Sequence, residues 1–365
     1  MFRRVSNAGI LPRFLRGNRR IPSASFSMAS SSSSSLPSSY TVTADNINPH
    51  VRDTSYEVRG EIYLAAVKRA AEGKQVLYTN IGNPHSLGQK PLTFTRQVLA
   101  LALTPFLLDH PEVERLFPSD AIARARAYHT AFKGGIGAYT DSKGDLSVRK
   151  EIARFIETRN HVTCDPENIF MGNGASEVVR LWLQMLLFSK SDGMLVSIPQ
   201  YPLYSAGISL NGGTLIPYYL QEEDNWSLDI GALQRSVDES RAKGITVKAM
   251  AYINPGNPTG QCLSESNLRD IIAFCHRNKL VLCADEVYQE NIYSSTPFVS
   301  ARAVLNKMPE PIRSSTELVS FHSISKGLSG ECGLRGGYME LHNIDPGTTL
   351  IYLPAHSSGS KDFLL

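Results

Sequence analysis

The stretch SFHSISKGLSGECGLRGGY, residues 320–338, decides how the rest of the chain is interpreted. Lys326 follows two alternating serines, a glycine comes directly after it, and Arg335 stands nine residues further on. The apolar run 318–321 before the lysine is typical of a buried strand. A lysine near the end of such a strand is partly desolvated, which lowers its pKa and frees the amine for imine formation. The stretch therefore predicts a chemically active lysine with a group of anion-binding residues beside it.

Short apolar runs alternate with helical patterns through the middle of the chain. The runs lie at 169–171, 194–198, 214–220, 247–253, 280–284 and 318–321. Helices are expected over 53–72, around 148–156, and where Leu268, Ile271, Ile272 and Cys275 recur at helical spacing. This alternation predicts an α/β fold with a mainly parallel sheet that helices cover on both faces. Ligands of such sheets bind beyond the carboxyl ends of the strands, so the residues after each run are the candidates for a site.

Glycines and polar residues follow several of these runs. The turn GNGASE, residues 172–177, offers free N–H groups and the Ser176 hydroxyl to an anion, although such a turn can simply join a strand to a helix. The segment NPGNPTG, residues 254–260, forms either a rigid turn or a holder for one asparagine that points into the site. Asp285 follows the run 280–284 directly. The strand ends thus bring an acid, an amide and an anion-binding turn to the lysine.

A phosphate-bearing aldehyde cofactor would use all of these groups. Ser323, Arg335 and the glycine turn would hold its phosphate, Asp285 would hold a pyridinium proton, and Lys326 would form the imine. A competing interpretation is an ATPase, because an apolar strand that ends in Asp-Glu also binds Mg²⁺ in P-loop enzymes. That reading requires an upstream G-x-x-x-x-G-K-[ST] motif, and the sequence lacks one because its Gly-Lys pair at 73–74 continues with glutamine.

Composition narrows the class of protein. Apolar residues make up 42% of the 365 residues and charged residues 19%, which fits a folded domain and gives no charge excess for nucleic acid. The stretch 181–188 is the nearest candidate for a membrane span, but it is too short to cross a bilayer, so no membrane partner is expected. The five cysteines form no C-x-x-C pair, which argues against a disulfide scaffold or a metal site and favours a reducing compartment.

Residues 1–44 differ from the rest of the chain. They hold six arginines, no lysine and no acid, and they include a serine run at 30–35. This composition is typical of an organelle transit peptide, with a disordered basic tail as the alternative. The mitochondrion is the first expectation, with a plastid or the cytoplasm as alternatives. Removing the six positive charges turns the formal net charge of +3 into −3, so the basic balance of the whole chain says nothing about nucleic acid.

The motifs together resemble the aspartate-aminotransferase superfamily of pyridoxal-phosphate (PLP) enzymes, and alanine aminotransferases in particular. The similarity runs from about 45 to about 346 and is carried by NINPHVRDTSYEVRGEI (46–62), NIGNPHSLGQKP (80–91), PQYPLYSA (199–206), INPGNPTGQ (253–261), LCADEVYQENIY (282–293) and SKGLSGECGLRGGY (325–338). The resemblance implies the PLP-dependent transferase fold of type I with a second, smaller domain. It also implies a homodimer.

The roles of the family carry over to the matching positions. The resemblance implies that Lys326 forms a Schiff base with PLP and then shuttles the substrate proton. Asp285 would pair with the pyridine nitrogen, and Asn257 and Tyr288 would hydrogen-bond the ring oxygen. Tyr201 would stack on the ring. The implied reaction is amino transfer between an amino acid and a 2-oxo acid, first alanine with 2-oxoglutarate, with glutamate–glyoxylate exchange as a close alternative.

Further positions follow from the same resemblance. The residues that would bind the phosphate are Gly174, Ala175, Ser176, Ser323 and Arg335. Tyr139, in the Gly-rich segment 133–144, would reach the phosphate of the partner subunit. Gly82 and Asn83 would line the substrate side.

The end of the chain departs from the family pattern. The expected division is a leader at 1–44, an N-terminal arm with part of the small domain at 45–115, a large PLP-binding domain at 116–345 and a divergent tail at 346–365. Family members continue further and supply an arginine for the substrate carboxylate, but no arginine follows Arg335 here. A truncated product of a longer gene is the favoured explanation. The alternative is a short form that binds PLP or dimerises without turnover.

Overall fold

The computed structural model describes residues 41–56, 60–78 and 82–348, and the chain divides into a short unit, 1–46, and a large unit, 47–365. In the short unit, the described residues 41–46 form a turn in which the Asn46 amide donates to the Thr41 carbonyl over 2.8 Å. The predicted leader before residue 41 and the predicted tail after residue 348 lie outside the described residues.

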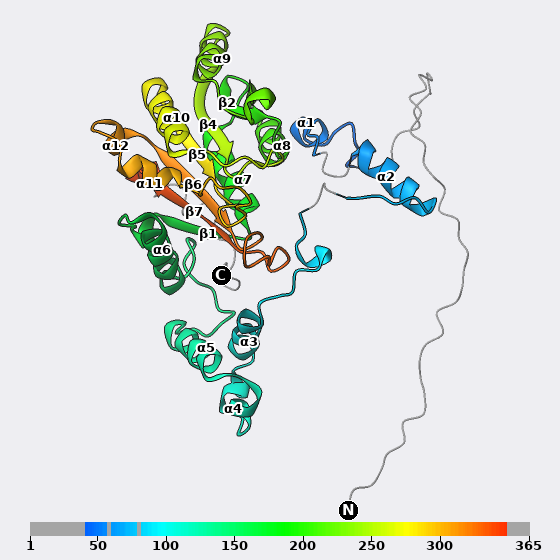
Figure 1. Cartoon of the computed structure of the whole chain (residues 1–365), viewed down its shortest axis with the longest axis vertical. Helices are drawn as coiled ribbons and strands as arrows, with labels where there is room; N and C mark the ends of the chain where they lie inside the picture. The colour runs from blue at the N-terminus through cyan, green and yellow to red at the C-terminus, as the bar shows by residue number, and fades with distance from the viewer. Residues whose placement is uncertain (1–40, 57–59, 79–81, 349–365) are drawn as a thin grey trace, which may run out of the picture. The chain divides into compact units, whose positions relative to one another are not determined.

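A seven-stranded sheet forms the centre of the large unit (Figure 1). Its strands are β1 (Ile169–Gly172), β2 (Asp192–Ile198), β3 (Thr214–Tyr219), β4 (Thr246–Ile253), β5 (Val281–Asp285), β6 (Leu318–Ser323) and β7 (Gly337–His342). Their order is β1-β7-β6-β5-β4-β2-β3. Strands β2 to β6 pair in parallel, whereas β7 is antiparallel to both β1 and β6. The predicted α/β fold with a mainly parallel sheet is confirmed.

Strand β7 was not predicted as a strand. Its apolar pattern is interrupted by Glu340, which is buried and pairs with Arg302 at 3.3 Å. An ion pair of this kind compensates the cost of burying a charge only after the two segments have come together. The local sequence pattern therefore does not indicate the strand.

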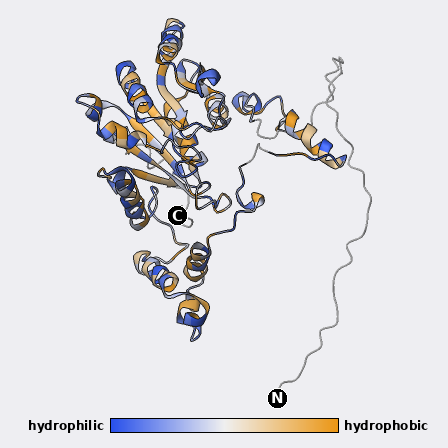
Figure 2. Cartoon of the chain, viewed as in Figure 1, coloured by the Kyte–Doolittle hydropathy of each residue, from blue (hydrophilic) through white to orange (hydrophobic). Residues whose placement is uncertain are grey.

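Helices cover both faces of the sheet, as predicted. One face packs against α9 (Ile230–Ala242), α10 (Glu265–Asn278) and α11 (Ala301–Asn306), and the other against α7 (Ala175–Leu186) and α8 (Leu203–Leu210). Successive strand residues alternate between the faces. The predicted helical spacing in α10 is confirmed, because Leu268, Ile271, Ile272 and Cys275 are all fully buried. Figure 2 shows the apolar strands between these helices.

Helix α6 (Leu146–Asn160) packs against β1 and β7, with Val148, Ile152 and Ile156 buried, which confirms the helix predicted there. The remaining elements are short. They are α12 (Ile312–Ser315), η2 (His85–Leu87), η3 (Pro105–Asp109), η4 (Pro166–Asn168) and η5 (Glu222–Asp224).

The N-terminal part of the large unit contains α1 (Pro49–Arg52), α2 (Glu61–Ala71), α3 (Thr93–Leu103), α4 (Val113–Leu116) and α5 (Ser119–Ala131). Helices α3 and α5 share a small core of their own. Helix α2 has no buried residue, and its Ile62 is 88% exposed. The helix predicted over 53–72 is confirmed at 61–71 and wrong at 53–56 and 60, which are not helical; residues 57–59 lie outside the described residues. Gly60, a poor residue for a helix interior, stands directly before α2.

Helix α7 brings Trp182 into the core beneath the sheet, where its indole N–H donates to the Cys283 sulfur of β5 over 3.2 Å. Among the described helices, none combines the length and apolarity that crossing a membrane requires.

Candidate active site

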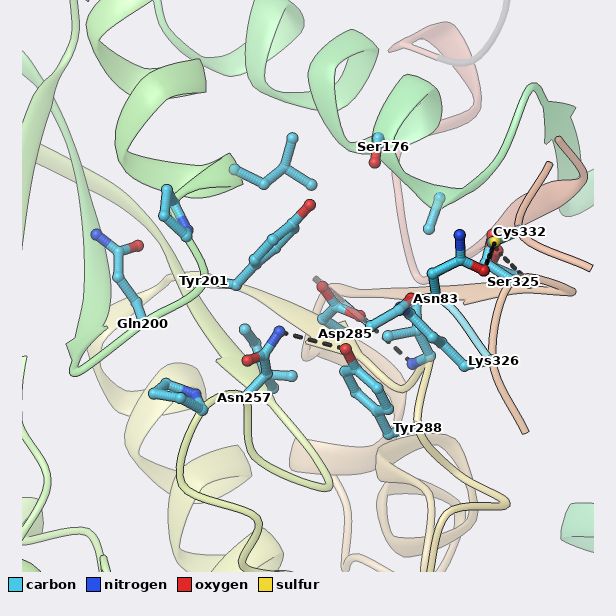
Figure 3. A pocket seen from close by; sticks show the side chains of 18 of the residues that line it. Asn83, Ser176, Gln200, Tyr201, Asn257, Asp285, Tyr288, Ser325, Lys326 and Cys332 are labelled. Atoms are coloured by element: carbon cyan, nitrogen blue, oxygen red, sulfur yellow. Dashed lines mark hydrogen bonds between the residues drawn. The ribbon is translucent and has the colours of Figure 1, made fainter. Parts of the chain in front are cut away.

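A cavity of about 570 Å³ opens at the carboxyl ends of β4, β5 and β6. Figure 3 shows side chains from these strand ends and from the loop before α8 converging on it. The predicted residues that line the cavity are Gly82, Asn83, Ala175, Ser176, Tyr201, Asn257, Asp285, Tyr288, Ser323, Lys326 and Arg335. Gly174 lies directly behind the lining, and Tyr139 lies elsewhere.

Lys326 stands in the turn after β6 and extends its amine into the cavity (Figure 3). Its Nζ donates to the Gly82 carbonyl over 2.6 Å and lies 5.6 Å from the centre of the Tyr288 ring. Burial lowers the pKa of Lys326, because the low-dielectric surroundings disfavour the ammonium form. The amine can therefore lose its proton more readily than a surface lysine can.

Asp285 ends β5 at the floor of the cavity and is only 4% exposed. Its Oδ2 accepts the Tyr204 hydroxyl over 3.0 Å, and its Oδ1 accepts the Val287 N–H over 3.4 Å. Burial raises the pKa of Asp285 to about 6, although both hydrogen bonds act in the opposite direction. Among the described residues no cation lowers this pKa, so a cationic N–H that enters the cavity would stabilise the buried carboxylate.

The two asparagines of NPGNPTG have different tasks. Asn257 lines the cavity, and its amide donates to the Tyr288 hydroxyl over 3.3 Å. Asn254 is fully buried; its side-chain oxygen accepts the Leu263 N–H over 2.9 Å, and its own N–H donates to the Asp285 carbonyl. Asn254 thus fixes the loop, and Asn257 is the asparagine that the loop directs into the site.

An anion cradle forms where α7 begins beside Arg335. Gly174, at φ 86°, precedes the helix without a side-chain cap, and Ala175 and Ser176 line the cavity. Arg335 donates from Nη2 to the Asn173 carbonyl over 2.9 Å. A Cβ on Gly174 would lie 2.4 Å from that nitrogen, so the close approach of backbone and guanidinium requires glycine. Helix N–H groups and a guanidinium together favour a phosphate.

Ser323 lies deeper in the wall. Its hydroxyl is buried within hydrogen-bond distance of the Gly336 carbonyl (3.1 Å) and the Ser325 hydroxyl (2.8 Å). Ser323 therefore ties the end of β6 to the start of β7 as well as lining the cavity.

Tyr201 forms the wall opposite the NPGNPTG loop. Its hydroxyl lies 2.7 Å from that of Tyr56, and the two rings meet edge to face at 6.4 Å. Burial raises the pKa of Tyr201, so the phenol stays protonated at neutral pH. Tyr139, in contrast, is 90% exposed and belongs to a separate hollow around 131–149.

Four residues with polar side chains that line the cavity or support it were not singled out from the sequence. Gln200, Ser325 and Cys332 line the cavity, and Tyr204 supports Asp285 from α8. All four lie inside segments that were quoted as motifs, and their closeness in sequence to the predicted site residues could have identified them. Among the described residues, no group of three His, Cys, Asp or Glu side chains is arranged to hold a metal ion.

Comparison with known proteins finds a matching family and similar sequences. Residues 110–343 match the family model "Aminotransferase class I and II". The chain is 56% identical over 303 residues to glutamate–glyoxylate aminotransferase 1 of Arabidopsis thaliana, covering 83% of this chain and 63% of that protein. It is 50% identical over 321 residues to the mitochondrial alanine aminotransferase 1 of the same plant, covering 85% of this chain and 58% of that protein. The chain thus spans about three fifths of the length of these relatives.

Solved structures of aminotransferases share the fold of this chain. An aminotransferase from Escherichia coli superposes with a TM-score of 0.66 at 27% identity, covering 87% of this chain and 69% of that one. An alanine aminotransferase from Pyrococcus furiosus also reaches 0.66, at 22% identity, over 85% of this chain and 68% of that one, which is a likeness of fold.

Proposed function

Because the chain belongs to the class I and class II aminotransferases, we propose that it binds pyridoxal 5′-phosphate and transfers an amino group between an amino acid and a 2-oxo acid. The fold and family are PLP-dependent in general. One observation carries the proposal for this chain. A lysine with a lowered pKa and a buried carboxylate with a raised pKa face the same cavity, next to an anion cradle.

The residues present fit this cofactor. Arg335 and the start of α7 would hold the phosphate, and Asp285 would accept the N–H of the pyridine ring. Asn257 and Tyr288, already hydrogen-bonded to each other, both offer hydrogen bonds to the ring oxygen. Tyr201 would stack on the ring, and the Lys326 amine would meet the aldehyde.

PLP, when bound, supplies an electron sink that stabilises negative charge at the substrate Cα. Every other task would fall to the protein. Lys326 would take the proton from the substrate Cα and hold it for a later return, and its lowered pKa provides the neutral amine that a general base requires. Asp285 would hold a proton at the ring nitrogen and so keep the ring electron-poor. Gly82 and Asn83 would orient the substrate.

Two substrate pairs follow from the relatives. Alanine with 2-oxoglutarate is supported by the names of the alanine aminotransferases, and glutamate with glyoxylate by those of relatives at 56% and 55% identity. Rates with the two pairs, measured side by side on one preparation, distinguish them.

The proposal extends to assembly, location and domains. A homodimer is supported by Tyr139, whose 90% exposure would let it reach the phosphate of a partner subunit. A mitochondrial location is supported by relatives named as mitochondrial, with a plastid or the cytoplasm as alternatives. We also keep the division into an arm with part of a small domain at 45–115 and a large PLP-binding domain at 116–345.

The test is chemical labelling of the full chain. The protein is mixed with PLP and reduced with borohydride, and the modified peptide is mapped. A single pyridoxyl group on Lys326, absent from Lys326→Arg, supports the proposal. Lys143 serves as the internal control, because it is also buried but is held by Glu167 at 3.1 Å. Labels spread over surface lysines would contradict a PLP site in this chain.

A further inference from the structure

The substrate side of the cavity belongs to a segment outside the sheet. Residues 82–96, here called the strap, carry Gly82 and Asn83 into the cavity and end in α3. The strap lies against residues 326–335, here called the lysine loop. The contacts between them are Lys326 Nζ to Gly82 O (2.6 Å), Cys332 Sγ to Asn83 Oδ1 (3.6 Å) and Gln89 Nε2 to Leu328 O (3.1 Å).

An ion pair closes the far end of this contact. Arg96 donates from Nε and Nη2 to the two carboxylate oxygens of Glu331, over 3.0 and 2.8 Å. The Glu331 side chain is 3% exposed and that of Arg96 46%. His85 Nε2 lies 4.0 Å from the same carboxylate. The Glu331 backbone N–H donates to the Ile324 carbonyl over 2.9 Å, which anchors the acid to the turn that carries Lys326.

This geometry is demanding. A planar guanidinium that meets a carboxylate through two parallel hydrogen bonds fixes orientation as well as distance. A buried carboxylate is stable only while it has such a partner, whereas a half-exposed arginine is solvated in any case. The ion pair with Glu331 therefore fixes the position of Arg96 and of the strap that carries it. Gly82 and Asn83 lie on the same short segment, so their positions in the cavity are fixed as well.

We propose that Arg96 and Glu331 are a positioning pair that sets the substrate side of the site against Lys326, and that the pair controls substrate affinity rather than cofactor binding. Neither residue lines the cavity, so the pair acts through the strap. Of the cofactor-side groups, Asp285 ends β5 and Asn257 stands in the loop after β4 that Asn254 fixes, so the sheet positions both of them rather than the strap. The effect on substrate rests on the proposed function; the effect on the strap does not.

The experiment uses the full chain and the isosteric variant Glu331→Gln, with Arg96→Lys as the conservative partner that keeps the charge. Hydrogen exchange of peptides from 84–96 measures the strap, borohydride labelling measures PLP on Lys326, and the visible absorbance of the loaded chain is titrated with alanine and with glutamate. In Glu331→Gln we expect strap exchange and the apparent Kd of the amino acids to rise roughly tenfold, while PLP labelling stays within about twofold. Arg96→Lys should fall between this variant and the unsubstituted chain.

Glu340→Gln is the matched control, because Glu340 is also buried and paired with an arginine, Arg302 at 3.3 Å, but that pair joins β7 to α11 and includes no residue of the strap. It should lower global stability and leave strap exchange relative to the rest of the chain unchanged. Unchanged strap exchange in Glu331→Gln, or equal acceleration in Glu340→Gln, overturns the proposal. So does a loss of PLP labelling equal to the loss of amino-acid affinity. If the unsubstituted chain does not label at Lys326, the proposed function fails, and strap exchange alone still decides whether the pair holds the strap.

Discussion

The two sides of the cavity are built in different ways. The cofactor side comes from strand ends: Asp285 is continuous with β5, and the residues before it, 281–284, are buried between two layers of helices. The substrate side comes from the strap, which touches the lysine loop through a few polar contacts. Figure 2 shows the apolar strands behind the first side. The difference teaches that the packing of the sheet fixes the position of Asp285, whereas the position of the substrate side depends on a few side-chain contacts.

The largest effect should come from the sheet. Asp285→Asn removes the carboxylate that would hold a proton on the ring nitrogen, and amino transfer by the PLP-loaded chain should fall roughly 10²–10³-fold, as for other removed electrostatic groups. The measurement is kcat with a saturating amino donor. A fall of less than about threefold would show that the buried acid is structural and would remove the contrast between the two sides.

The same variant should also change how the free energy of unfolding depends on pH when no cofactor is bound. The folded pKa of Asp285, about 6, exceeds its unfolded value of 3.8. The folded state therefore retains a proton that the unfolded state has lost, and stability declines as pH rises from about 4 through 6, by about 1.4 kcal/mol per unit of pKa difference. Burial also raises the pKa of the neighbouring Glu286, to about 7, which adds a decline of the same sign. Urea unfolding at pH 4 and pH 7 should therefore show a smaller decline in Asp285→Asn than in the unsubstituted chain.

The next effect concerns the anion cradle. Gly174→Ala places a Cβ 2.4 Å from Arg335 Nη2 at φ 86°, so the guanidinium must move. Strain of about 1–3 kcal/mol corresponds to a loss of PLP affinity of roughly 5–150-fold. Gly244→Ala is the control, because Gly244 has a similar φ of 79° and nothing within 4 Å. Equal losses in the two variants would mean that backbone strain, rather than the cradle, sets the affinity.

Tyr204→Phe sharpens the comparison of the two sides, because it removes the hydroxyl that donates to Asp285 and leaves the carboxylate itself in place. The Tyr204 hydroxyl lowers the pKa of Asp285, so its removal should raise that pKa above about 6. The pH at which PLP binding reaches half its maximum should then move upward by about one unit, with affinity at pH 6 falling roughly fivefold. Tyr218→Phe, whose hydroxyl donates to the Ala251 carbonyl, should leave this profile in place.

The smallest effect is expected on α2. Ile62→Ser removes an apolar side chain that is 88% exposed, so the free energy of unfolding should change by no more than about 0.5 kcal/mol. Leu101→Ala, in the core shared by α3 and α5, should cost about 2–5 kcal/mol by the same urea titration. A large loss for Ile62→Ser would show that another surface covers α2 in solution.

The residues that could be predicted share one property. Lys326, Asp285 and Asn257 each follow an apolar run, and strand ends in a parallel sheet meet at one edge, so their convergence follows from the pattern of the chain. The fold class followed from the same pattern. Tyr204 could not be predicted to support Asp285, because that contact spans 81 positions and depends on how α8 packs. Strand β7 was hidden by Glu340, whose partner Arg302 is distant in sequence.

Roles that depend on a bound group or a partner subunit do not follow from the fold of one chain. The partner-subunit role of Tyr139 and the roles given to the lining residues are set by groups that bind, not by the packing of the chain. The Arg96–Glu331 pair was missed for a different reason. Both residues read as ordinary charged positions, and only the folded chain shows that one of them is buried.

The contact between Trp182 and Cys283 has an optical consequence. Trp182 is one of only two tryptophans in the chain, and Cys283 stands two residues before Asp285 on β5. The Trp182 indole is therefore held next to the strand that carries Asp285 into the cavity. At that position it can transfer energy to a chromophore that occupies the cavity. Filling the cavity with a ligand that absorbs in the near ultraviolet should quench the emission of this indole, so the protein carries an intrinsic fluorescent gauge of its own occupancy.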